Sequence, residues 1–296
     1  MSWVFYTFAA TILWASIEVA DKIIVNKEVK DIFITTSFSL CSHFIVLVLL
    51  SLIFGSENIY SFNWYSVIIC ILYFGSILSY YSGLESEEVS RFGPTLSITT
   101  IFIVIFAYLF LGESFQPIIY LGIILTICGA VLVSLKDPLH SLSKLKSKLG
   151  FIFAIIASSF FAARELVFKY SSTLFDFWNL TFWIGISGAI FSILIMLTKS
   201  QKIKQANLTG LKHLTILGIV NGLAYYFYIN ALDKGPVSLV AAVAEIEAII
   251  IFLLTVLLGK FSPKLLKEEY NFAILTQKLI AVVLSVSGVI LIHLYS

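Results

Sequence analysis

Charged residues are scarce in this sequence of 296 residues, and that scarcity decides its class. Asp, Glu, Lys and Arg together make up 12% of the chain, whereas soluble proteins average about 25%. A soluble domain could not cover its surface with so few charges, and 59% of the residues are hydrophobic. The sequence therefore predicts an integral membrane protein, most of which lies within the bilayer.

Other absences exclude classes of function. The net charge is only +2, which gives no electrostatic footprint for nucleic acid. The three cysteines and four histidines are scattered without metal-site spacing, so we expect no metal and no cofactor. The sequence has no GxxxxGK[ST] loop, so we expect no ATP-driven pumping by this chain alone. It also has no Ser-His-Asp, Cys-His or His/Asp constellation, so we expect no enzyme, and a membrane-embedded lipid-modifying enzyme is the least favoured alternative.

Apolar segments of spanning length are abundant, since a bilayer takes about 20 residues of helix. They predict an all-α protein with ten transmembrane helices, at residues 3–24, 32–54, 64–83, 91–111, 117–135, 150–171, 177–198, 213–232, 236–258 and 274–294. The first segment lacks a positively charged start and contains Glu18, so we interpret it as a mature helix rather than a signal peptide.

The basic residues fall in alternate loops. Of the 19 Lys and Arg residues, all but Arg164, Lys169 and Lys234 belong to the odd-numbered loops or the helix ends beside them. By the positive-inside rule those loops are cytoplasmic and both termini face outward. We expect a multi-pass protein of the cell membrane.

The two halves of the chain repeat each other. Trp14 to Lys22 matches Phe161 to Lys169, with an aromatic residue, Glu and Lys at the same spacing. Two further matches follow in the same order at nearly the same offset, namely Ser90, Pro94 and Ser97 with Ser238, Ala242 and Glu245, and Leu111-Gly112-Glu113 with Leu258-Gly259-Lys260. We therefore predict a first repeat at 1–135, a linker at 136–149 and a second repeat at 150–296. Five helices is an odd number, so the repeats are inverted relative to each other, an arrangement common in secondary transporters.

The residues of the fourth and ninth helices resemble a known family. Phe110-Leu111-Gly112-Glu113 and the pattern Ala231-Leu232 followed by Gly235-Pro236-Val237-Ser238-Leu239-Val240, together with the two five-helix halves, are similar to EamA-type members of the drug/metabolite transporter superfamily. The resemblance implies a central cavity lined by the first, third, fourth, sixth, eighth and ninth helices, with the fifth and tenth joining the halves. Two features depart from the family pattern, Lys260 in place of Glu and the stretch Glu245-Ile246-Glu247.

Two carboxylates interrupt the ninth apolar segment. A charge at that depth costs about 2.5–3.5 kcal/mol on insertion scales, so a chain that keeps two carries them for a purpose. Glu245 and Glu247 would point about 200° apart on one helix. Glu245 shares a small polar face with Ser238, which favours a solvated pathway, and Glu247 is left for an interhelical hydrogen bond. The alternative is that both are protonated and merely satisfied by neighbouring helices.

Other polar residues in the apolar segments are candidates for a site. Arg164 is placed to contact Glu165 or Glu245, either as a structural ion pair or as a gate or substrate anchor. The tyrosines of the third and eighth helices suit an organic or cationic substrate, although membrane tyrosines also serve as interfacial belts or packing. We expect His43 to be packed and hydrogen-bonded, and Pro94 to start or kink the fourth helix.

These residues favour a secondary transporter of a small organic metabolite, such as an amino acid or an amine, working by alternating access. The expected substrate-binding residues are Trp14, Glu18, Tyr80, Tyr81, Ser97, Arg164, Glu165, Asn221, Tyr225 and Glu245. Glu18 and Glu245 would respond to protons or another cation, and export is favoured by the resemblance alone. The expected partners are the substrate, membrane lipids and coupling protons, with no nucleic acid, in a monomer or homodimer. A passive channel or facilitator is the main alternative.

Overall fold

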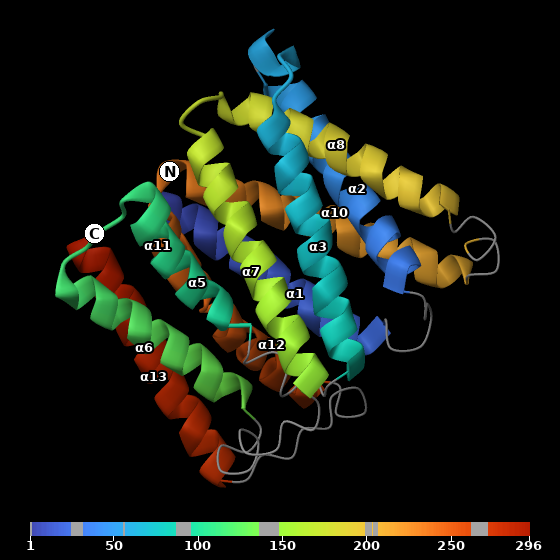
Figure 1. The fold of residues 1–296 in the computed structure, drawn as a ribbon. Coiled ribbons are helices and arrows are strands. Elements are labelled where there is room, and N and C mark those ends of the chain that lie inside the picture. Colours follow the sequence, from blue (N-terminus) through green and yellow to red (C-terminus); the bar gives the residue numbers. More distant parts are fainter. Residues whose placement is uncertain are drawn as a thin grey trace.

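Large apolar side chains remain on the outside of this fold as well as in its core, and polar side chains of the helices are also buried, as expected of a protein in a bilayer. The computed structural model describes residues 2–24, 32–55, 57–86, 96–135, 148–198, 203, 207–261 and 272–296. Within these residues it is an all-helical bundle with no strand (Figure 1). The hydroxyl of Ser51 donates to the Leu47 carbonyl and that of Ser192 to the Gly188 carbonyl, each 2.8 Å away, because the bilayer offers no water to satisfy them. Many large apolar side chains, such as Phe110 and Ile53, remain exposed for lipid.

The described helices follow the expected segments closely. Their bounds are α1 (Trp3–Ile24), α2 (Ile32–Phe54), the 3-10 turn η2 (Glu57–Tyr60), α3 (Trp64–Ser86), α5 (Ile98–Phe106), the π-helical turn η3 (Ala107–Leu111), α6 (Pro117–Ser134), α7 (Lys148–Ser171), α8 (Phe177–Thr198), α10 (Leu208–Lys234), α11 (Val237–Ala244), α12 (Glu247–Phe261) and α13 (Phe272–Tyr295). Nine described spans are long and apolar enough to cross a membrane, with α11 and α12 forming one of them. The shorter apolar stretch Ile98–Leu111 is the described part of the expected fourth helix, and Pro94 lies outside the described residues.

The helix contacts repeat when the two halves are exchanged. The helices of the first half are α1, α2, α3, α5 and α6, and their counterparts in the second half are, in the same order, α7, α8, α10, α11–α12 and α13. Under this correspondence, the packing of α1 on α10 is equivalent to the packing of α7 on α3. In the same way α5 packs on α7 as α12 packs on α1. In the pairs α2–α8 and α6–α13, each helix packs on its own counterpart from the other half. The two pairs lie at opposite edges of the bundle (Figure 1). This is the contact pattern of a two-fold relation between the halves, and it places residues from both halves at the centre.

The α6–α13 pair is joined through glycine. A Cβ on Gly288 would lie 2.5 Å from the Gly122 carbonyl oxygen, and one on Gly122 would lie 2.9 Å from the Gly288 carbonyl oxygen. Further along, a Cβ on Gly129 would lie 2.7 Å from the carbonyl oxygen of Ala281. As the residue number on α6 rises from Gly122 to Gly129, the number of the contacting residue on α13 falls from Gly288 to Ala281, so the two helices are antiparallel. Small residues let the two backbones approach closely, which stabilises helix pairs in lipid.

We expect Gly288→Leu to destabilise the protein strongly. The leucine side chain has no space between α13 and the α6 backbone, and overpacking of this kind costs about 1–3 kcal/mol or more. Thermal unfolding of the purified protein in detergent measures the effect. The matched control is Val283→Leu on the same helix, whose side chain is 64% exposed, and its melting temperature should be unchanged. Equal melting temperatures for both variants would contradict the close approach of α6 and α13.

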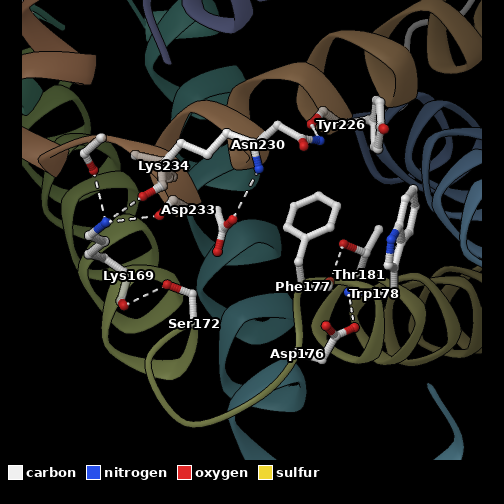
Figure 2. Close-up of polar contacts among 12 residues, drawn as sticks. Lys169, Ser172, Asp176, Phe177, Trp178, Thr181, Tyr226, Asn230, Asp233 and Lys234 are labelled. Atoms are coloured by element: carbon white, nitrogen blue, oxygen red, sulfur yellow. Dashed lines mark hydrogen bonds and ion pairs between the residues drawn. The ribbon is translucent and has the colours of Figure 1, made fainter. Parts of the chain in front are cut away.

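The junction between α10 and α11 is capped from both sides. Lys169 Nζ donates to the carbonyl oxygens of Leu232 at 2.8 Å, Asp233 at 3.3 Å and Gly235 at 2.9 Å (Figure 2). The Glu113 carboxylate accepts hydrogen bonds from the backbone N–H groups of Val237 at 2.7 Å and Ser238 at 3.0 Å. A cation thus meets the carbonyl end of one helix and an anion meets the amide end of the next, as helix dipoles favour.

We expect Lys169→Met to loosen this junction. Loss of the ammonium leaves three carbonyl groups without their charged donor, and a hydrogen bond to a charged group is worth about 1.5–3 kcal/mol. The melting temperature should fall and hydrogen exchange at Gly235 and Val237 should quicken. Lys234→Met is the control, because that ammonium is exposed and makes a 3.4 Å surface contact with the Asp233 carboxylate and long contacts with two aromatic rings, without capping a helix end. Equal effects of the two variants would refute a capping role for Lys169.

Candidate functional site

The ninth membrane span is broken at its carboxylates. The sequence predicts one helix over 236–258, but α11 ends at Ala244 and α12 begins at Glu247. Between them the backbone hydrogen bonds join residues three apart instead of four. The Ile246 N–H donates to the Val243 carbonyl at 3.2 Å, and the Ala248 N–H donates to the Glu245 carbonyl at 3.3 Å. The expectation of one uninterrupted helix is therefore wrong, whereas the angle between Glu245 and Glu247 stays a prediction.

Glu245 joins this break to the first half of the chain. Its carboxylate accepts hydrogen bonds from Ser97 Oγ at 2.8 Å and Thr100 Oγ1 at 2.5 Å. Ser97 precedes α5 directly and Thr100 lies in its first turn. The interhelical hydrogen bonds expected of Glu247 are thus made by Glu245. Ser97 and Glu245 are also the residues that the repeat matches with each other, so their contact lies close to the two-fold relation between the halves.

Glu18 approaches the same break from α1. Its side chain is exposed, and α1 packs directly on α12. Glu18 and Glu245 both act electrostatically on Glu247, the first residue of α12. The break therefore gathers acidic groups from both halves. No group of three metal-ligating side chains suited to an ion occurs among the residues that the structure describes.

A second centre surrounds Arg164 on α7. Arg164 is 4% exposed, and its guanidinium lies over the rings of Tyr73 at 4.7 Å, Phe161 at 5.0 Å and Tyr225 at 5.2 Å from Cζ to centroid. We refer to these three rings as the aromatic cage. The Nη2 atom of Arg164 also forms an ion pair with Glu165 Oε1 at 3.0 Å. Cation–π contacts and a charge partner are what make a buried guanidinium tolerable in an apolar core.

Glu165 connects the Arg164 centre to α10 and α1. Its second carboxylate oxygen accepts a hydrogen bond from the Tyr228 hydroxyl at 2.7 Å. The Tyr228 ring lies 5.0 Å from that of Trp14, and Trp14 Nε1 donates to Asn221 Oδ1 at 2.8 Å. Helices of both halves thus share one continuous polar and aromatic network in the middle of the bundle.

His43 on α2 completes this centre. It is fully buried, and its ring centroid lies 5.1 Å from those of both Tyr73 and Tyr225. The expectation of a packed histidine is confirmed. The expected hydrogen bond is not found, because neither ring nitrogen has a partner among the described residues.

The residues predicted from the sequence divide into three places. Five meet around the ion pair (Trp14, Arg164, Glu165, Asn221 and Tyr225), and three belong to the helix break (Glu18, Ser97 and Glu245). Tyr80 and Tyr81 lie near the other end of α3, with their rings 5.4 Å apart. They are about 10 Å along that helix from Tyr73, at 1.5 Å per residue.

Sequence reasoning missed two members of the aromatic cage and one hydrogen-bond donor to Glu245. Tyr73 stands in an apolar run where nothing distinguishes it from packing residues, whereas Phe161 could have been found as the counterpart of Trp14 in the repeat. Thr100 could have been found, because it follows Ser97 by three residues and so shares its helical face. The side chain of Lys260, which departs from the family pattern, lies outside the described residues.

Comparison with known proteins agrees with this architecture. The sequence model of the EamA-like transporter family matches residues 1–135 and again residues 148–294. No curated protein matches the sequence. One solved structure, described only as "Crystal structure of protein", superposes with a TM-score of 0.75 at 17% identity, over 99% of this chain and 97% of that one. At that identity the likeness shows the fold alone.

Proposed function

The chain belongs to the EamA-like transporter family, a membrane transporter family of the drug/metabolite type, and from this we propose that it is a secondary active transporter of a small organic metabolite. Transport would proceed by alternating access, with the two inverted halves rocking about a site at mid-membrane. Such a site lies between repeats in many secondary transporters. Catalysis plays no part in the proposal.

The observation that carries the proposal is the buried ion pair of Arg164 and Glu165 inside the aromatic cage. Placing both charges in an apolar interior is costly, and apolar residues of similar size would hold the fold as well. An intramembrane ion pair lined by residues of both halves is the arrangement expected of a substrate site. It offers a cation, an anion and aromatic faces, which together suit an amino acid, an amine or a related compound.

Coupling is proposed to run through Glu245. In its ionised form the carboxylate accepts from both Ser97 and Thr100 and holds α5 against the break between α11 and α12. A proton on one oxygen removes part of that acceptor capacity and weakens the attachment. Protonation would therefore release two helices of opposite halves, with Glu18 as a second acidic group at the same break.

Direction, membrane and assembly are further parts of the proposal. We favour export, on the family relationship alone, across the cell membrane with the lysine-rich loops in the cytoplasm. The two fused halves make a single chain sufficient, and a homodimer is the alternative state. A passive channel or facilitator is the other candidate function, because a leak pathway also needs a polar interior.

Transport by the reconstituted protein tests the proposal. Proteoliposomes are loaded with a pool of amino acids and amines, and efflux of each compound is followed by mass spectrometry with and without an imposed proton gradient. We expect one chemical class to move, to show counterflow, and to move against its own gradient when protons are supplied. Downhill movement alone, without counterflow, would establish the facilitator. No movement of any compound would contradict the proposed substrate class.

A further inference from the structure

Three buried nitrogen atoms at the centre of the bundle have no hydrogen-bond partner among the described residues. They are Arg164 Nε and both ring nitrogens of His43. Arg164 is 4% exposed and His43 is 0% exposed. The bilayer interior supplies no water to such groups, and buried donors in folded proteins are nearly always paired. Unpaired donors at this position therefore indicate a place for acceptor atoms of a ligand.

Arg164 and His43 are neighbours that approach from different halves. Both pack on the same two rings, Tyr73 and Tyr225, at 4.7–5.2 Å. His43 is on α2 and Arg164 on α7, so a ligand that bridges them would join the first repeat to the second.

The chemistry of these donors selects an anion with two oxygen atoms. Arg164 already uses one terminal nitrogen on Glu165, and its Nε–H is buried without a partner among the described residues. A neutral imidazole supplies one N–H donor. A carboxylate offers one oxygen to each, and hydrogen bonds to an ionised acceptor are the strong ones. The rings of Tyr73 and Tyr225 would then lie against the apolar part of the same molecule.

We infer that Arg164 and His43 form a carboxylate-binding subsite, which receives the acid group of the transported metabolite. The inference rests on the proposed transport function and narrows its substrate class to compounds that carry a carboxylate, thereby setting simple amines aside. It also assigns a ligand role to a helix, α2, that the family resemblance leaves out of the cavity.

Binding to the purified full-length protein tests the subsite without any need for transport. The probes share one apolar body and differ in the head group: 3-phenylpropionate, 3-phenylpropionamide and 3-phenylpropylamine. Affinity is measured by thermal shift and by tryptophan fluorescence. The variants are His43→Phe, which keeps the ring contacts and removes both nitrogens, and Arg164→Gln. His293→Phe, at the exposed end of α13, is the matched control.

We expect 3-phenylpropionate to bind the wild type and the His293→Phe control with equal affinity, at least about 10-fold more tightly than the amide or the amine, which corresponds to about 1.4 kcal/mol. His43→Phe should weaken it at least about 10-fold, and Arg164→Gln should abolish binding. Unchanged affinity in His43→Phe would remove His43 from the subsite and overturn the inference. Preference for the amine, or no binding of the carboxylate, would also overturn it. Each of these results leaves the transport assay free to succeed, so failure of the subsite is distinguishable from failure of the proposed function.

Discussion

Arg164→Gln is expected to abolish transport in proteoliposomes, with a fall of at least about 100-fold in the counterflow rate. The substitution removes the only cation of the aromatic cage and leaves Glu165 as a buried carboxylate that keeps only its Tyr228 donor among the described residues. Breaking a buried pair in this way costs about 3–5 kcal/mol, so the variant should also melt at a lower temperature. Transport rate and thermal unfolding are measured on the same preparation.

The double variant Arg164→Gln/Glu165→Gln separates a structural role from a functional one. With both charges removed, no uncompensated charge remains and the melting temperature should recover most of the loss. Transport should stay abolished, because the cage no longer holds a cation. If the double variant transports as well as the wild type, the ion pair is structural and the substrate site lies elsewhere.

Glu245→Gln is expected to uncouple transport from the proton gradient. The amide oxygen can still accept a hydrogen bond from Ser97 or Thr100, so the fold and substrate exchange should be retained. The amide cannot gain and lose a proton, so gradient-driven accumulation should fall at least about 10-fold while counterflow persists. Parallel assays of counterflow and proton-driven accumulation measure the two quantities.

Glu247→Gln is the matched control for this prediction, because it makes the same change of charge two residues away at the start of α12. It should leave accumulation largely intact. Thr100→Val tests the attachment of α5 to Glu245 by removing the hydrogen-bond donor instead of the carboxylate. It removes the shorter of the two hydrogen bonds to Glu245 and should shift the pH profile of transport. Full proton-driven accumulation by Glu245→Gln would show that coupling resides in another group.

The fold followed from the sequence because long apolar runs have one stable form in a bilayer. Helices at Trp3–Ile24, Ile32–Phe54 and Phe177–Thr198 begin and end where hydropathy and charge change. The repeat placed Ser97 opposite Glu245 in the alignment, and the structure brings these two residues into contact. Arg164 and Glu165 stood out because charges are rare and costly in apolar segments.

The remaining features depend on tertiary contacts that no local pattern encodes. The break at Glu245 occurs in a strongly apolar stretch without proline or glycine, and its carboxylate is held by hydroxyl groups from the other half of the chain. Tyr73 joins the cage through its contact with Arg164, whereas Tyr80 and Tyr81, which look alike in sequence, lie farther along α3. Which tyrosine faces the centre is decided by how α3 packs on α7.

Access to the central network from the two sides of the membrane tests alternating access most directly, and it needs no substrate. Asn221→Cys, in a chain whose native cysteines Cys41, Cys70 and Cys128 are replaced, puts one thiol beside Trp14. Proteoliposomes receive a membrane-impermeant thiol reagent outside or inside, with a reporter thiol trapped in the opposite compartment. The account predicts that the cysteine reacts from either side while the reagent never reaches the reporter. Passage of the reagent to the reporter would identify a channel, and reaction from one side only would contradict a site that alternates between the two.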